Sequence, residues 1–187
     1  MGWHDHVGLS PQGQLDAKKT AQKLKQYPID FAFHSDFIRT SETAKIISDE
    51  IGMAITPTHY LRERNLGNFA ELTMGEIKAN RPDDWAKFLD HHDPDWNGLE
   101  GGSLWDVSDR FHKFVSQILS QYPSKSILLI THSGYIHTIL RDYFEFFDKD
   151  SFEEVGHSSV TILEKEGNKY NIITYNEWEL LNGKNSI

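Results

Sequence analysis

The sequence contains no cysteine, no long apolar run and no excess of basic residues, and each absence excludes a class of protein. Without cysteine, the chain can form neither disulfides nor thiolate metal sites. No apolar run approaches the roughly 20 residues that a membrane-spanning helix needs. The 19 basic and 28 acidic residues give a formal net charge of −9, which argues against a broad nucleic-acid surface because such a surface needs a basic stripe.

What the chain does contain is the composition of an ordinary globular protein. Its 187 residues are 38% hydrophobic and 25% charged, enough for one domain with a substantial core. The amino terminus has neither the basic start nor the apolar stretch of a secretory signal, so we expect a cytoplasmic protein. Residues 1–187 are therefore predicted to form a single domain.

Apolar periodicity predicts alternating helices and strands. The expected helices cover residues 11–27, 37–51 and 104–118. The expected strands cover residues 29–33, 54–61 and 127–131, followed by a closing hairpin of residues 159–164 and 169–175. This order is typical of an α/β sandwich with an antiparallel edge.

Residues 66–102 differ in character from the rest of the chain. They are rich in Asp, Asn, Pro, Gly and Trp, with short helices expected at residues 74–80 and 85–89. We interpret this segment as a lid-like insertion over one end of the sheet and not as a second domain.

The most informative stretch is residues 127–134, Ile-Leu-Leu-Ile-Thr-His-Ser-Gly. Its apolar half predicts a buried strand, and a helical pattern begins at Gly134. His132 therefore follows a buried strand, where open α/β sheets bind their ligands. The helix start suits an anion such as phosphate. A histidine that merely completes a strand-to-helix turn is the alternative.

Two further polar residues follow expected strands. Arg39 comes after the first strand, and its guanidinium together with His132 could bind a phosphoryl group and neutralise its charge. Glu63 follows the next strand, where a carboxyl near a phosphate can donate a proton to a leaving alkoxide. The alternatives are a surface arginine and a solvated glutamate paired with Arg62 or Arg64.

Four segments together resemble the histidine phosphatase superfamily, which includes cofactor-dependent phosphoglycerate mutases and many small phosphatases. The segments are residues 2–13, 35–44 (Ser-Asp-Phe-Ile-Arg-Thr-Ser-Glu-Thr-Ala), 61–67 (Leu-Arg-Glu and a later Gly) and 131–134 (Thr-His-Ser-Gly). The resemblance implies a three-layer α/β/α sandwich that is phosphoglycerate mutase-like, with a mostly parallel sheet and a C-terminal antiparallel hairpin.

The same resemblance implies roles for four residues. Arg39 would clamp the phosphate, and His132 would bind the phosphoryl group in the transition state. Glu63 would give a proton to the leaving group and later act as the base for water. Ser133 stands where the family usually has glycine, and we expect it to contact the phosphate. The family reacts through a covalent phosphohistidine, and the resemblance implies no metal and no other cofactor.

The family's signature, Arg-His-Gly at the end of the first strand, does not occur in this sequence. Its histidine is the family's nucleophile, and roughly 20 residues, a strand and a loop, are expected to be missing before residue 1. In the family that strand is central, so we expect unpaired edges on its two neighbours. His4, His6 and His34 are the candidates for a replacement nucleophile.

These features favour a phosphatase acting on a phosphate monoester over a mutase. Classical mutases of the family carry a long basic insertion, whereas residues 68–102 are short and acidic. The alternatives are a non-catalytic phosphate-binding or interaction module (a pseudophosphatase) and an N-terminally truncated remnant. The expected partner is a small phosphorylated substrate or inorganic phosphate, without nucleic acid or membrane, and a homodimer is an option.

Overall fold

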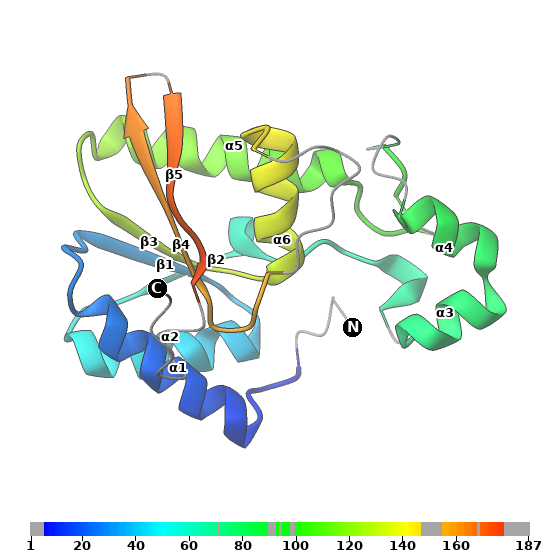
Figure 1. Cartoon of the computed structure of the whole chain (residues 1–187), viewed down its shortest axis with the longest axis horizontal. Coiled ribbons are helices and arrows are strands. Elements are labelled where there is room, and N and C mark those ends of the chain that lie inside the picture. Colours follow the sequence, from blue (N-terminus) through cyan, green and yellow to red (C-terminus); the bar gives the residue numbers. More distant parts are fainter. Residues whose placement is uncertain are drawn as a thin grey trace, which may run out of the picture.

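Helices cover both faces of a central sheet (Figure 1). The computed structural model describes residues 6–70, 72–89, 93, 95–97, 100–146, 155–167 and 169–177. One face carries α1 (Pro11–Leu24) and α2 (Ile38–Ile51), and the other carries α5 (Leu104–Gln121) and α6 (Ser133–Thr138). The predicted α/β fold with helices around the sheet is therefore confirmed.

The central sheet contains three parallel strands in the order β2-β1-β3. They are β1 (Phe31–Ser35), β2 (Thr56–Thr58) and β3 (Ile127–Ile130). In the register, His34 of β1 lies opposite both Pro57 and Ile130. Because the strands are parallel, the residues that follow β1 and β3 meet at the same edge of the sheet.

The C-terminal strands form a separate two-stranded sheet, as the alternating pattern predicted. β4 (Val160–Glu166) and β5 (Lys169–Glu177) are antiparallel, and Gly167 turns between them with a φ of 60°. In the described ranges β3 pairs only with β1, yet Ile130 and Val160 belong to one hydrophobic cluster. The two sheets therefore share a core without sharing a hydrogen-bonded ladder.

The predicted bounds of the first two strands were wrong: the strand expected over residues 29–33 covers Phe31–Ser35. The strand expected over residues 54–61 covers only Thr56–Thr58, and a 3₁₀ turn, His59–Leu61, follows it. The turn directs Leu61 into the main hydrophobic cluster, where none of its surface is exposed. Further along the chain, α6 ends at Thr138, and a π-helical turn, Ile139–Tyr143, follows it directly.

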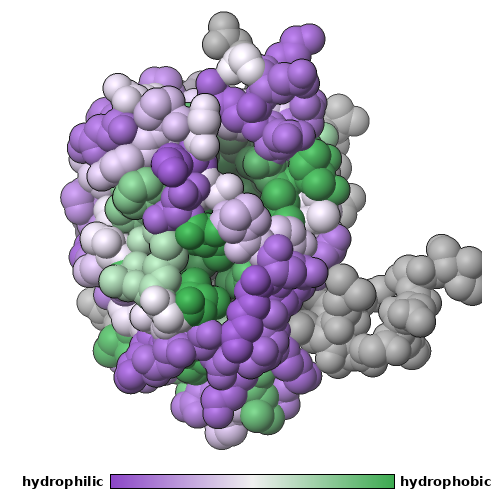
Figure 2. Space-filling view, turned by 90° about the vertical axis from the view of Figure 1, so that its left-hand side faces the viewer, coloured by the Kyte–Doolittle hydropathy of each residue, from purple (hydrophilic) through white to green (hydrophobic). Residues whose placement is uncertain are grey.

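The side of the molecule near the amino ends of the parallel strands is partly apolar. Figure 2 shows hydrophobic residues gathered in hollowed areas between hydrophilic ones on this side. A shallow groove of about 330 Å³ lies there; its lining residues are Leu24, Lys25, Tyr27, Ile29, Glu50, Ile51 and Met53. Ile29 precedes β1, so this groove lies near the amino ends of the strands. None of the helices in the described ranges has both the length and the apolar character that crossing a membrane requires.

The described residues within 66–102 form an arm to one side of the sheet, with α3 (Met74–Asn80) and α4 (Pro82–Leu89) as its helices (Figure 1). A capping box between Thr73 and Glu76 starts α3. The arm has a hydrophobic cluster separate from those around the sheet, made of Leu66, Phe69 and Ile77 with Leu72, Trp85, Phe88 and Trp96 packed against them. It is therefore a small unit with its own core.

Gly101 anchors the end of the arm against neighbouring backbone. A Cβ at this position would lie 2.5 Å from the Asn65 carbonyl oxygen and 2.8 Å from the Gly67 nitrogen, atoms that cannot rotate away. We expect Gly101→Ala to lower the free energy of unfolding by about 1–3 kcal/mol, the usual cost of overpacking. Thermal melts would measure it.

Gly75→Ala is the matched control for this substitution. A Cβ on Gly75 of α3 has its nearest neighbour, Thr73 Oγ1, at 3.9 Å, so alanine should be neutral or slightly stabilising in the helix. Equal losses of stability in the two variants would contradict the steric explanation.

Candidate active site

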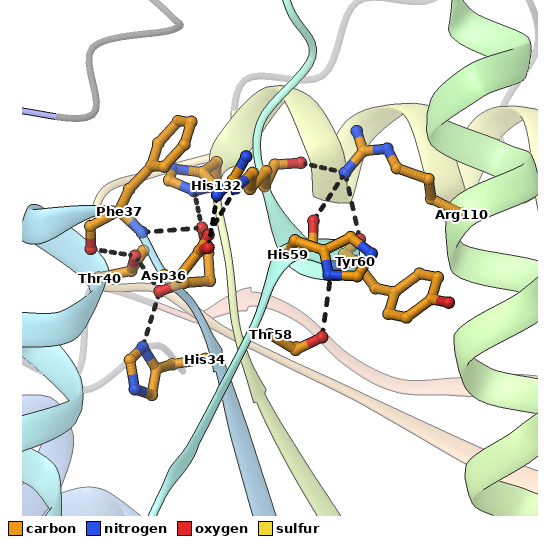
Figure 3. A network of polar contacts seen from close by, with 11 residues as sticks. His34, Asp36, Phe37, Thr40, Thr58, His59, Tyr60, Arg110 and His132 are labelled. Atoms are coloured by element: carbon orange, nitrogen blue, oxygen red, sulfur yellow. Dashed lines mark hydrogen bonds and ion pairs between the residues drawn. The ribbon is translucent and has the colours of Figure 1, made fainter.

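His132 lies directly after β3 and precedes the first residue of α6. It is buried, with 7% of its surface exposed, and both ring nitrogens form hydrogen bonds. Nδ1 is 2.9 Å from Arg39 Nη2, and Nε2 is 2.9 Å from Ser35 Oγ (Figure 3). A guanidinium can only donate, so Nδ1 accepts and the proton is on Nε2, which donates to Ser35. The imidazole is neutral and its tautomer is fixed.

The surroundings of His132 keep it neutral. Burial, followed by the charges of Arg39 and Arg110, lowers the pKa of the imidazole to about 3. The edge of the ring faces Phe37, with centroids 5.3 Å apart. A phosphoryl group at this position would add negative charge beside the ring and would favour the protonated imidazole.

Arg39 reaches His132 from the first turn of α2, which follows β1. Its guanidinium is half-buried and lies 5.1 Å from the centre of the Phe37 ring. Burial lowers the pKa of the guanidinium and the charge of Glu63 raises it, but an arginine stays charged in proteins. The parallel register thus brings Arg39 and His132 into contact although they are 93 residues apart.

The Glu63 side chain contacts the first turn of α6, and the residue is 8% exposed. Its carboxylate accepts hydrogen bonds from the backbone N–H of Arg64 at 2.9 Å and of Gly134 at 3.1 Å. Burial raises the pKa of the carboxyl, although both N–H donors and Arg39 oppose the shift. The helix start that the sequence suggested as a phosphate site therefore already has its Gly134 N–H bonded to a carboxylate.

Replacing Glu63 with glutamine is expected to change how stability depends on pH. The folded-state pKa of this carboxyl exceeds its ordinary value of 4.5, so its contribution is full below that value and is lost as pH rises through the folded pKa. The melting temperature of Glu63→Gln relative to the unmodified protein should therefore be higher at pH 8 than at pH 4. Calorimetry at the two pH values measures this difference.

Glu76→Gln provides a control of opposite sign. Hydrogen bonds from Thr73 lower the pKa of the Glu76 carboxyl, so its contribution appears above the unfolded pKa and is lost as pH falls. Its variant should lose stability, relative to the unmodified protein, as pH rises from 4 to 8. The same trend in both variants would show that burial of Glu63 does not set the pH dependence.

An ion pair that sequence reasoning missed lies beside the pocket. Arg62 donates from Nε and Nη2 to the two carboxylate oxygens of Asp36, each at 2.6 Å. This fork lowers the pKa of Asp36 and joins the loop after β1 to the segment that carries Glu63. Arg62 therefore pairs with Asp36 and not with Glu63. The signal was available, because Asp36 directly follows a strand and Arg62 adjoins Glu63.

Arg64 links the site to the arm. It is 7% exposed and donates at 2.8 Å to the carbonyls of Gly102 and Trp96. Its guanidinium also lies 5.8 Å from the Phe88 ring centre and 5.5 Å from that of Trp96. Arg64 therefore does not form the expected surface ion pair with Glu63. Its side chain instead binds the arm to the residue next to Glu63.

The remaining candidate residues differ in placement. Ser133 is half-buried at the first position of α6, next to His132. His34 Nδ1 lies 2.7 Å from the Ser35 carbonyl oxygen, and its side chain points away from His132 (Figure 3). His6 is exposed, and His4 lies outside the described residues. His34 is therefore not positioned to attack a phosphoryl group beside His132.

The α/β fold thus brings an arginine, a neutral histidine and a buried carboxyl together at one edge of its parallel sheet. A sequence profile of the histidine phosphatase superfamily (branch 1) matches residues 1–177, and the chain belongs to this superfamily.

Individual relatives agree with this assignment. Phosphoglycerate mutase-like protein 4 of Arabidopsis thaliana is 31% identical over 139 residues, which are 73% of this chain and 60% of that protein. Glucosyl-3-phosphoglycerate phosphatase of Mycobacterium tuberculosis is 28% identical over 150 residues, which are 70% and 66%. The chain spans about three fifths of the length of the first curated relatives that it matches.

A solved structure supports the fold. The mycobacterial glucosyl-3-phosphoglycerate phosphatase, in a vanadate complex, superposes with a TM-score of 0.83 at 23% identity and covers 94% of this chain and 90% of that one. The phosphoglycerate mutase-like fold expected from the sequence is therefore confirmed.

Proposed function

We propose that this chain forms the phosphate site of a phosphatase that hydrolyses a phosphate monoester. The observation that carries the proposal is the neutral, buried His132, held between Arg39 and Ser35. Arg39 neutralises the bound anion, and His132 donates to it from Nε2 once the anion displaces Ser35. Glu63, with a raised pKa, supplies the proton for the leaving alkoxide. Ser133 contacts the phosphate beside His132.

The residues assigned above to the proposed site do not include a nucleophile. In the superfamily's mechanism a histidine takes the phosphoryl group, the P–O bond to the leaving alkoxide breaks, and water then attacks the phosphohistidine to release phosphate. A strand added parallel to β3, at the edge that pairs with none of the described strands, would end beside His132. We propose that turnover requires such a strand, carrying Arg-His-Gly, and that without it the chain binds phosphate only.

The arm favours a phosphatase over a mutase. A mutase must return the phosphoryl group to its substrate, and the short acidic arm offers little to retain a highly anionic intermediate. We propose that residues 66–102 act as a lid of one domain, residues 1–187, over a small phosphorylated substrate. The phosphatase relative and its phosphate and vanadate complexes support this choice. A cytoplasmic location stays a prediction.

A second function, a non-catalytic phosphate-binding module, is favoured by one observation, the absence of Arg-His-Gly from the sequence. Hydrolysis of para-nitrophenyl phosphate separates the two, measured for the unmodified chain beside His132→Ala and Glu63→Gln. Turnover that disappears in both variants would mean that another group supplies the nucleophile. If none of the three proteins hydrolyses the substrate but vanadate still binds, the result supports the phosphate-binding module. If a folded chain neither hydrolyses the substrate nor binds vanadate, the result contradicts the phosphate site itself.

A further inference from the structure

The segment that carries Glu63 is held by side chains and not by a regular element. It comprises residues 59–63, a 3₁₀ turn followed by extended backbone. Each of its five consecutive carbonyls accepts a hydrogen bond from a side chain elsewhere in the fold. The position of Glu63 therefore depends on these donors.

Arg110 of α5 supplies most of the donors. Its Nη1 lies 2.9 Å from the Arg62 carbonyl oxygen and 3.2 Å from that of Tyr60, and longer contacts of 3.4 Å reach the carbonyls of His59 and, from Nη2, Glu63. Figure 3 shows the guanidinium extending from α5 across this turn. One side chain thus binds four of the five carbonyls.

Two other side chains complete the set. Tyr135 Oη donates to the Tyr60 carbonyl at 2.9 Å, and Thr131 Oγ1 donates to the Leu61 carbonyl at 2.7 Å. Tyr135 also lies under Arg110, whose guanidinium is 5.5 Å from the ring centre. Residues from α5, α6 and the end of β3 therefore meet on the carbonyl side of the turn.

The chemistry of this position requires an arginine. A planar guanidinium can donate to several carbonyls at once in a fixed geometry, whereas a lysine ammonium is a flexible point donor. The carbonyls are neutral, so the charge of Arg110 still acts on its surroundings, and it is one of the charges that lower the pKa of His132. Arg110 thus affects both the position of Glu63 and the charge state of His132 without lying in the phosphate pocket.

We infer that Arg110 is a positioning residue of the site: it fixes residues 59–63 so that the Glu63 carboxylate meets the Gly134 N–H beside Arg39 and His132. The inference rests on the proposed function for its catalytic meaning. The bond between Gly134 and Glu63 is its direct structural consequence and can be measured without any ligand.

The test compares Arg110→Met and Arg110→Lys with Lys113→Met, which removes an exposed charge one turn further along α5. Two quantities are measured: vanadate affinity, and the exchange rate of the Gly134 amide by NMR relative to core amides of β1. In Arg110→Met we expect on the order of tenfold weaker vanadate binding and tenfold faster Gly134 exchange, the size of a lost charged hydrogen bond. Arg110→Lys should fall between, and Lys113→Met should match the unmodified chain.

Unchanged Gly134 exchange in a folded Arg110 variant would overturn the inference. If Arg110→Met does not fold, Arg110→Lys decides, because it keeps the charge but loses the fork. If the unmodified chain binds no vanadate, the proposed function fails, while the exchange of Gly134 still tests the role of Arg110. A uniform acceleration of Gly134 and β1 amides would show a merely structural role and would also count against the inference.

Discussion

Arg39→Ala is expected to weaken vanadate binding on the order of 10- to 100-fold, because a hydrogen bond to a charged group is worth about 1.5–3 kcal/mol. Arg39 is half-buried and is the group that contacts His132 Nδ1. Its loss removes the cation nearest the proposed anion and leaves Nδ1 without its donor. Isothermal titration calorimetry with vanadate measures the change.

Two variants accompany this measurement. Arg39→Lys keeps the charge but not the fork, so it should recover only part of the affinity. Lys45→Ala removes an exposed cation from the same helix, where the Lys45 side chain is 75% exposed, and should leave affinity unchanged. A loss of affinity in Lys45→Ala equal to that in Arg39→Ala would mean that long-range charge, and not the pocket, binds the anion.

Supplying a strand that carries Arg-His-Gly is expected to have the largest effect of all. The chain would be extended by a family member's first strand, ending in Arg-His-Gly, so that this strand can pair with the edge of β3 that none of the described strands contacts by backbone pairing. We expect phosphatase turnover to rise on the order of 10⁶-fold, the size of the loss that removal of the nucleophile causes in a serine protease. The melting temperature should rise by about 2–4 °C for each kcal/mol gained.

The control is the same extension with the motif's histidine replaced by alanine. Strand pairing depends on backbone groups, so this variant should gain the same thermal stability while hydrolysing nothing. Turnover in the alanine version would show that the nucleophile lies elsewhere in the chain. A histidine version that gains neither stability nor turnover would show that β3 does not accept a strand at this edge.

Sequence patterns predicted the parts of the site that follow regular elements. Ile127–Ile130 is apolar throughout, and Arg39 and His132 follow strands whose parallel pairing brings them together. The strand expected up to Leu61 failed because burial of Leu61 bends the chain into a turn. Arg110 could not be predicted, since its partners are backbone carbonyls about 50 residues away and carbonyls leave no trace in a sequence.

The same limit applies to protonation. His132 is a histidine in the sequence, but only the contact with a guanidinium at Nδ1 fixes which nitrogen carries the proton. Likewise Glu63 reads as a solvated residue beside two arginines, and only its burial at the start of α6 raises its pKa. The charge state of a side chain depends on its contacts in the folded protein and could not be predicted from the sequence.

The arm carries an evolutionary consequence. The described members of its aromatic cluster all come from residues 66–102, and Arg64 is one of its links to the segment that carries Glu63. Substitutions inside this cluster can therefore accumulate without disturbing the strands that hold Arg39 and His132. A lineage could therefore exchange one arm for another while the residues at the ends of the parallel strands are inherited unchanged.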